Sequence, residues 1–266
     1  MEIDRQKVIK AFKDYVDNYN TTDEKIRLKI EHTYRVSELC ESIAQSLQLD
    51  GTECDLAWLL GMLHDIGRFE QLRNYGTFID AQSIDHALYG AEILFEQDRI
   101  RDYIEDAVED KMLRTAVAYH SAYRLPEVLD ERTRMFCQIL RDADKIDILK
   151  VNVDFPLEEI YNVSTDKLLT AEVSEAVMEA FKEGHTVLRS LKRTPADNVV
   201  GHISLVYELV YPRSLALVKE QGYIQKLMDF QSKNPKTQGQ FEQIRETMKG
   251  YLQEAEKGLA CRDEGV

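Results

Sequence analysis

The 266-residue sequence has few of the residues that interrupt helices or cross-link a fold. It contains 5 prolines, 12 glycines and 4 cysteines. The cysteines form no CxxC pair and are too sparse for a disulfide scaffold, so we expect reduced thiols in a cytoplasmic protein. They are Cys40, Cys54, Cys137 and Cys261.

Long apolar runs and an excess of basic charge are also missing. No apolar stretch reaches membrane-spanning length, and the N-terminal MEIDRQKVIKAFKDYVDNYN has no apolar core typical of a signal peptide, so no membrane partner is expected. The 34 basic and 48 acidic residues give a net charge of −14. Duplex nucleic acid would be repelled over most of such a surface, whereas a local basic pocket for a small phosphate ester is allowed. The sequence gives no indication of oligomeric state.

Helical periodicity dominates what is present, and no strand-like alternation persists, so the fold class is predicted to be all-α. Residues 66–82 (IGRFEQLRNYGTFIDAQ) combine glycine, aromatic and charged residues and are interpreted as a loop. The polar stretch QSKNPKTQGQ is interpreted as a flexible connection. Helices are predicted at residues 4–17, 24–48, 53–65, 83–97, 100–120, 131–150, 171–192, 198–220 and 238–258.

Three segments follow from this pattern. Residues 1–25 form an N-terminal helix, and residues 26–150 form a helical bundle that carries the chemically informative residues. Residues 151–266 form a C-terminal helical region that is expected to pack on the bundle and to cover one side of its pocket.

Histidines and aspartates recur on the apolar faces of the predicted helices of the bundle. One such residue is commonly a satisfied core group, but six on five helices are difficult to explain by packing alone. A buried carboxylate must be paired, hydrogen-bonded or metal-bound, because its desolvation alone is too costly. Helices of a bundle can project such ligands to a shared centre. The six are His32, His64, Asp65, His86, His120 and Asp144.

Imidazole and carboxylate ligands together favour Fe, Mn, Co or Zn over a thiolate site or an all-oxygen calcium site. His64 and Asp65 are adjacent at a helix end, where they can approach one centre from two directions. Gly67 is expected to let the backbone turn away after them. The sequence therefore predicts a site for one or two divalent transition-metal ions.

The order H…HD…H…H…D resembles the HD-domain (HDIG-type) metal-dependent phosphohydrolase superfamily. The local sequences EHTYRV, LLGMLHDIGRF and LRDADKIDIL carry the resemblance, which covers about residues 26–150. It implies an HD-domain helical bundle in which four residues bind a first metal: His32, His64, Asp65 and Asp144. It also implies a second metal on His86 and His120 with Asp65 as a bridge, although members with a single metal can carry incidental histidines at these positions.

The resemblance implies hydrolysis of a phosphomonoester or phosphodiester, most often of a nucleotide, with Asp65 in the catalytic centre. A metal pair lowers the pKa of a bridging water to about 7 and supplies hydroxide. Arg68 and Lys145 are candidate contacts to the substrate phosphate. The alternative for Arg68 is an ion pair with Glu70 or Asp80, and the alternative for Lys145 is a solvated surface position.

Two other functions remain open at this point. A mixed-valent di-iron oxygenase uses a similar ligand set, so the ligands alone do not exclude oxygen chemistry. A non-catalytic nucleotide-sensing module could use the metal site as a binding platform, although every ligand position is filled here. His202 lies in an apolar helix, where a core or pocket-lining role is expected and no metal role is implied.

Overall fold

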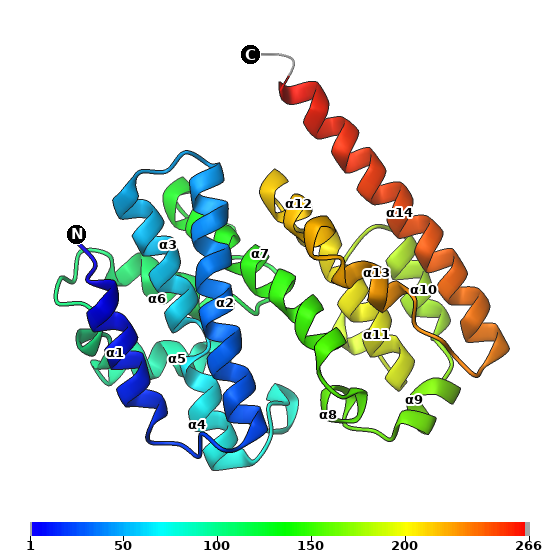
Figure 1. Ribbon diagram of the computed structural model, residues 1–266, viewed down its shortest axis with the longest axis horizontal. Helices are drawn as coiled ribbons and strands as arrows, with labels where there is room; N and C mark the ends of the chain where they lie inside the picture. The colour runs from blue at the N-terminus through cyan, green and yellow to red at the C-terminus, as the bar shows by residue number, and fades with distance from the viewer. Residues whose placement is uncertain (1, 264–266) are drawn as a thin grey trace. The chain divides into compact units, whose positions relative to one another are not determined.

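The computed structural model describes the backbone of residues 2–263 and the side chains of residues 2–255. All regular structure in this part of the chain is helical, which confirms the all-α prediction (Figure 1). The chain divides into two compact units, residues 1–147 and residues 148–266. The expected packing of the C-terminal helices on the bundle stays a prediction.

The N-terminal unit contains the predicted bundle, and its last helix continues past the boundary between the units. Its elements are α1 (Arg5–Val16), α2 (Glu24–Ser46), α3 (Gly51–Leu63), α4 (Ile66–Tyr75), η1 (Asp80–Gln82), α5 (His86–Ala91), the π-helical turn η2 (Glu92–Glu96), η3 (Arg99–Asp102), α6 (Asp110–Tyr119) and α7 (Glu131–Asp154).

The C-terminal unit consists of shorter helices and one long final helix. Its elements are α8 (Leu157–Tyr161), α9 (Thr165–Thr170), α10 (Glu175–Lys182), η4 (Arg189–Leu191), α11 (Pro195–Ile203), η5 (Ser204–Glu208), α12 (Pro212–Gln221), α13 (Tyr223–Met228) and α14 (Pro235–Asp263).

Aspartates begin the helices that carry the site. The side chain of Asp23 accepts a hydrogen bond from a first-turn amide of α2, Asp50 does the same for α3, and Asp85 accepts from two amides of α5. Each bond satisfies backbone donors that have no partner within the helix, which fixes the residue at which the helix starts. The register of the ligands on these helices is set in this way.

The backbones of α2 and α3 approach closely at a glycine, and the two helices lie side by side in Figure 1. A Cβ atom on Gly61 would lie 2.4 Å from the Cα of Ser37, so only glycine permits this contact. The predicted apolar faces are buried here, including Val36 and Ile43 of α2 and Leu59 of α3. This packing holds the inward face of α2 against the end of α3.

The predicted loop at residues 66–82 is wrong in its first half, which forms α4. Ile66 and Phe69 are buried three residues apart on one helix face, and their burial outweighs the weak local signal of the glycine and charged residues. Gly76 ends the helix with a φ of 69°, a left-handed conformation that glycine adopts without cost.

The predicted turn at Gly67 is also wrong, because this glycine lies inside α4. A Cβ there would lie 2.3 Å from the carbonyl oxygen of His86 and 2.6 Å from the backbone nitrogen of Gly90. Gly67 is therefore required for the close approach of α4 and α5, which brings His86 toward Asp65.

Several long predicted helices are shorter in the structure. Residues 83–97 become α5 and η2, the 100–120 prediction retains η3 and α6, and residues 171–192 retain mainly α10. The prediction at 198–220 is divided because Pro212 cannot continue a helix and instead begins α12. The polar connection before residue 238 is partly helical, since α14 starts at Pro235.

Three of the cysteines are free and buried, as expected for core thiols: Cys40, Cys54 and Cys137. Cys261 lies outside the residues whose side chains are described. No helix within residues 2–263 combines the length and the apolar character needed to span a membrane.

Candidate metal centre

The structure brings all six predicted ligand residues together from six different positions in the N-terminal unit. The histidines and Asp65 are each at most 3% exposed, and the Asp144 side chain is 13% exposed. The positions are His32 on α2, His64 at the end of α3, Asp65 between α3 and α4, His86 at the start of α5, His120 at the end of α6 and Asp144 on α7.

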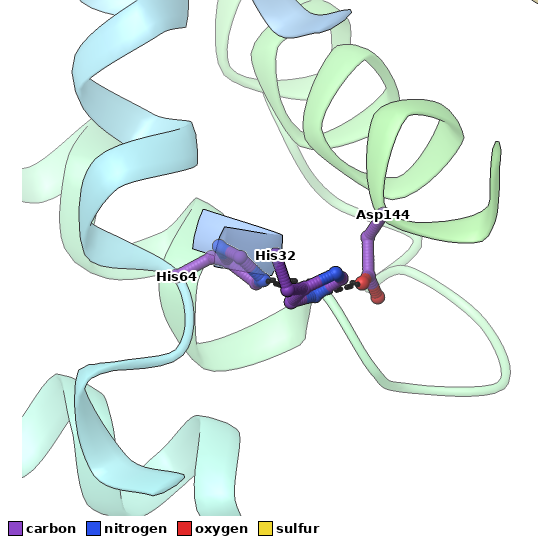
Figure 2. A group of neighbouring side chains, drawn as sticks. All are labelled: His32, His64 and Asp144. Atoms are coloured by element: carbon purple, nitrogen blue, oxygen red, sulfur yellow. Dashed lines mark hydrogen bonds and ion pairs between the residues drawn. The ribbon is translucent and has the colours of Figure 1, made fainter. Parts of the chain in front are cut away.

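One histidine pair lies beside Asp144. The Nε2 atoms of His32 and His64 are 3.2 Å apart, and Asp144 Oδ1 lies 3.2 Å from the Nε2 of His32 and 3.8 Å from that of His64. Figure 2 shows the ring of His32 between the other two side chains. These three side chains could hold a single ion between them.

A second histidine pair has the same geometry. The Nε2 atoms of His86 and His120 are 3.1 Å apart, and their rings meet edge to face with centroids 5.0 Å apart. The sequence placed these two residues among the six candidate ligands, and their assignment to a second ion came from the resemblance only. Their convergence is the observation that favours a second ion.

Asp65 lies between the two pairs and presents one oxygen to each. Its Oδ2 is 3.5 Å from the Nε2 of His32 and 3.4 Å from that of His64. Its Oδ1 is 3.5 Å from the Nε2 of His86 and 3.7 Å from that of His120. A carboxylate in this position can bridge two ions.

Backbone carbonyls hold two of the imidazoles. The Nδ1 of His64 is 2.7 Å from the carbonyl oxygen of Gly61, and the Nδ1 of His120 is 2.7 Å from that of Val117. Both histidines cap a helix and donate to the carbonyl three residues earlier. Because Nδ1 donates, the lone pair of the neutral ring is on Nε2, which faces the centre.

Carboxylates hold the other two imidazoles. Asp147 Oδ2 lies 2.6 Å from the Nδ1 of His32, and Asp80 Oδ2 lies 2.8 Å from the Nδ1 of His86. Arg35 also donates to Asp147 and compensates part of its charge. A carboxylate in this position orients a histidine ligand and raises its basicity. The sequence did not indicate Asp80 in this role.

The nitrogen separations fit a bound cation in each pair. Two rings that direct lone pairs at one point repel each other unless a cation or a proton lies between them. With metal–nitrogen bonds of about 2.1 Å, adjacent ligand atoms are about 3.0 Å apart at a right angle and about 3.4 Å apart at the tetrahedral angle. The separations of 3.2 and 3.1 Å lie within this range.

The electrostatics of the centre favour ionised carboxylates and a neutral second pair. Burial opposes ionisation of Asp65, but the charge of Lys29 and the interaction with His64 outweigh it and hold the pKa of Asp65 well below its usual value. Burial lowers the pKa of His120 to about 3, and it also lowers the pKa of His86. These are the protonation states that a metal ion requires of its ligands.

His32 differs from the second pair. Burial and the charge of Lys29 lower its pKa, but hydrogen bonds with Asp144 and Asp147 more than compensate, so the net pKa lies above the usual value. A proton and a cation at the first pair therefore compete for His32.

Lys29 is another residue of the centre that the sequence prediction missed. Its Nζ lies 2.6 Å from Asp65 Oδ2, and its side chain is only 16% exposed. It precedes His32 by three residues on α2 and so shares its face. That spacing could have indicated that Lys29 lies near the centre, but a lysine in an amphipathic helix is ordinarily interpreted as a solvent-exposed residue.

Arg68 is anchored by one nitrogen. Its Nη1 donates to the side chains of Gln71 and Asp80 and to the carbonyl of Phe78, so the predicted alternative of an ion pair with Asp80 is present. Its Nε is buried without a hydrogen-bond partner and lies 3.7 Å from Asp65 Oδ1. The anchoring therefore leaves part of the guanidinium directed at the centre.

Lys145 follows Asp144 directly on α7 and is 8% exposed. The alternative of a solvated surface lysine is therefore wrong. Its contact with substrate stays a prediction.

Residues 30–149 match the family model of the HD domain. This part of the chain is therefore similar to the HD domain, the class that the order and setting of its histidines and aspartates predicted. HD domains bind divalent metal ions. Three groups of side chains here could each hold one: His32, His64 and Asp144; His64, Asp65 and His120; and Asp80, Asp85 and His86.

One curated relative is the 3'3'-cGAMP-specific phosphodiesterase 1 of Vibrio cholerae serotype O1 (strain ATCC 39315 / El Tor Inaba N16961). It is 26% identical to this chain over 144 residues, which are 52% of this chain and 30% of the relative. The chain thus spans less than a third of that protein's length. No solved structure matched the chain.

Proposed function

We propose that this chain is a metal-dependent phosphohydrolase that cleaves a phosphomonoester or phosphodiester of a small nucleotide. The observation that carries the proposal is the position of Asp65, with one oxygen facing each of two histidine pairs. The HD domain supports hydrolase chemistry on phosphate esters as a class.

Six residues are assigned to the metal ions. His32, His64 and Asp144 would hold the first ion, His86 and His120 would hold the second, and Asp65 would be shared. When bound, two divalent cations supply a nucleophile from water at neutral pH and offset the charge on phosphoryl oxygens. Backbone carbonyls and the carboxylates of Asp80 and Asp147 orient the four histidines through their Nδ1 atoms. The neighbouring cationic and imidazole groups favour the ionised forms of Asp65 and Asp144.

We assign binding of the substrate phosphate to two cationic side chains, Arg68 and Lys145. Arg68 would present its free Nε, with Nη1 anchored to the loop around Phe78 and Asp80. Lys145 is the second assigned contact. A guanidinium held in place loses little conformational freedom on binding a phosphate oxygen.

The nucleotide part of the proposal is supported by the relative from Vibrio cholerae, whose name describes a phosphodiesterase acting on a cyclic dinucleotide. Because the alignment covers 30% of that protein, the cyclic dinucleotide is one compound to test among several. The net charge of −14 favours a small anion bound in a local cationic site over a long polyanion.

The test is a substrate screen on protein loaded with Mn²⁺ or Fe²⁺ under anaerobic conditions. The panel contains nucleoside monophosphates, 2',3'-cyclic mononucleotides and cyclic dinucleotides, and products are separated by chromatography. We expect turnover of at least one class. Asp65→Ala should abolish it while the helical circular dichroism is retained, because apolar faces hold the helices together.

The same samples distinguish the two alternative functions. Oxygen consumption by the iron-loaded protein without phosphate-ester cleavage would support the oxygenase. Tight nucleotide binding without turnover or oxygen consumption would support the sensing module. Either result would overturn the hydrolase proposal.

A further inference from the structure

Lys29 occupies the point at which the first histidine pair and Asp65 meet. Its ammonium lies 2.6 Å from Asp65 Oδ2, the same oxygen that faces the Nε2 atoms of His32 and His64. The carboxylate is 2% exposed, so a full negative charge there needs a nearby cation. Lys29 is the cation in hydrogen-bonding contact with it.

The ammonium and a divalent ion would compete for one carboxylate oxygen. If an ion at the first pair also took Asp65 Oδ2 as a ligand, its two positive charges would lie within a few ångströms of the ammonium. At such a distance like charges repel by several kcal/mol even at an effective dielectric constant of about 20. Lys29 and the ion therefore cannot both hold this oxygen at full strength.

The side chain of Lys29 has a path away from Asp65. It is a flexible four-carbon stem whose ammonium lies 5.7 Å from the centre of the Phe78 ring, and it retains 16% exposure. The guanidinium carbon of Arg68 lies 5.7 Å from the same ring. Two cations therefore border one aromatic side chain at the edge of the centre.

We infer that Lys29 is an exchangeable counter-cation: it neutralises Asp65 in the metal-free site and, once Asp65 binds a divalent ion, contacts a phosphate oxygen of the substrate. The inference rests on the proposed function for the identity of the anion. It adds a substrate-binding residue on α2, which contacts Oδ2 of Asp65, whereas Arg68 lies nearer Oδ1.

The inference makes two predictions of opposite sign for Lys29→Met. Loss of the competing ammonium should tighten Mn²⁺ binding to metal-stripped protein. Loss of the phosphate contact should weaken binding of inorganic phosphate to Mn²⁺-loaded protein. Each change should be about ten- to a hundred-fold, the range that corresponds to one hydrogen bond to a charged group. Both constants are measured by calorimetric titration and need no turnover.

Two further variants complete the experiment. Arg27→Met removes one positive charge from the same helix at a side chain that is 62% exposed, and it should change neither constant by more than about twofold. Lys29→Arg keeps the charge and should restore most of the phosphate affinity. A helix that has lost its packing would weaken both ligands, so the opposite signs exclude a merely structural role.

The outcomes are separable from those of the substrate screen. If Lys29→Met binds Mn²⁺ no more tightly than the unmodified protein, or binds phosphate equally well, the inference is wrong whatever the screen shows. If the screen finds no substrate while the two constants move in opposite directions, Lys29 keeps its role and the hydrolase proposal fails alone.

Discussion

Replacement of Gly67 by alanine tests whether the close contact of α4 and α5 builds the second half of the site. The added methyl group would lie 2.3 Å from the carbonyl oxygen of His86 and 2.6 Å from the backbone nitrogen of Gly90. Both obstacles are backbone atoms, so no side chain can rotate to make room. The two helices must separate, and His86 must move with α5.

The expected destabilisation follows from two opposing contributions. Overpacking of this kind costs about 1–3 kcal/mol, with backbone obstacles toward the upper end. Alanine inside a helix recovers about 0.5–1 kcal/mol relative to glycine. The free energy of unfolding of the N-terminal unit should therefore fall by about 1–2 kcal/mol. Displacement of His86 should also weaken the second Mn²⁺ by about tenfold or more.

Urea unfolding followed by tryptophan fluorescence measures the first effect. Trp58 is the sole tryptophan and is 6% exposed on α3, so its signal reports the N-terminal unit. Gly51→Ala is the matched control, because a Cβ at Gly51 meets no atom within 4 Å. If Gly67→Ala is as stable as this control and binds Mn²⁺ as tightly as the unmodified protein, the contact does not position His86.

Three other predictions follow from single side chains. Asp147→Asn should weaken Mn²⁺ binding by about ten- to a hundred-fold through loss of the charged partner of His32, and unchanged affinity in a calorimetric titration would contradict this. Arg68→Met should lower kcat/KM and also the melting temperature, because its Nη1 ties Asp80 to α4; an unchanged melting temperature would show that the anchoring contributes nothing. Burial lowers the pKa of His202 to about 3, whereas an unfolded histidine titrates near 6.5. Below about pH 6.5 the unfolded chain therefore binds a proton that the folded unit does not, and stability falls as the pH drops toward 3. His202→Gln should reduce this dependence in urea titrations followed by circular dichroism, and an identical pH profile would refute it.

The ligand residues could be recognised from sequence because a polar residue interrupts the apolar face of a predicted helix. His32 and Asp144 lie on faces that are otherwise apolar, and such positions require a compensating partner. His86 and His120 share this property only in part, and their role depended on resemblance. The structure supplies the distances that relate them to Asp65.

Other parts of the site have no local signature. Asp80 lies in a polar stretch, and its contacts with His86 and Arg68 arise only when the chain folds back on α4. The helical state of residues 66–75 is stabilised by burial of Ile66 and Phe69, which local propensity does not report. In the sequence Lys29 has the pattern of a surface lysine, and its contact with Asp65, just after the end of α3, exists only in the folded chain.

The number of metal ions per chain tests the central claim most directly. Protein stripped of metal is dialysed anaerobically under reducing conditions against excess Mn²⁺ or Fe²⁺, and the bound ions are counted by elemental analysis. We predict two ions per chain in the unmodified protein and one in the His86→Ala, His120→Ala double variant. A count that never exceeds one in the unmodified protein, or two ions retained by Asp65→Ala, would contradict a centre in which Asp65 joins two histidine pairs.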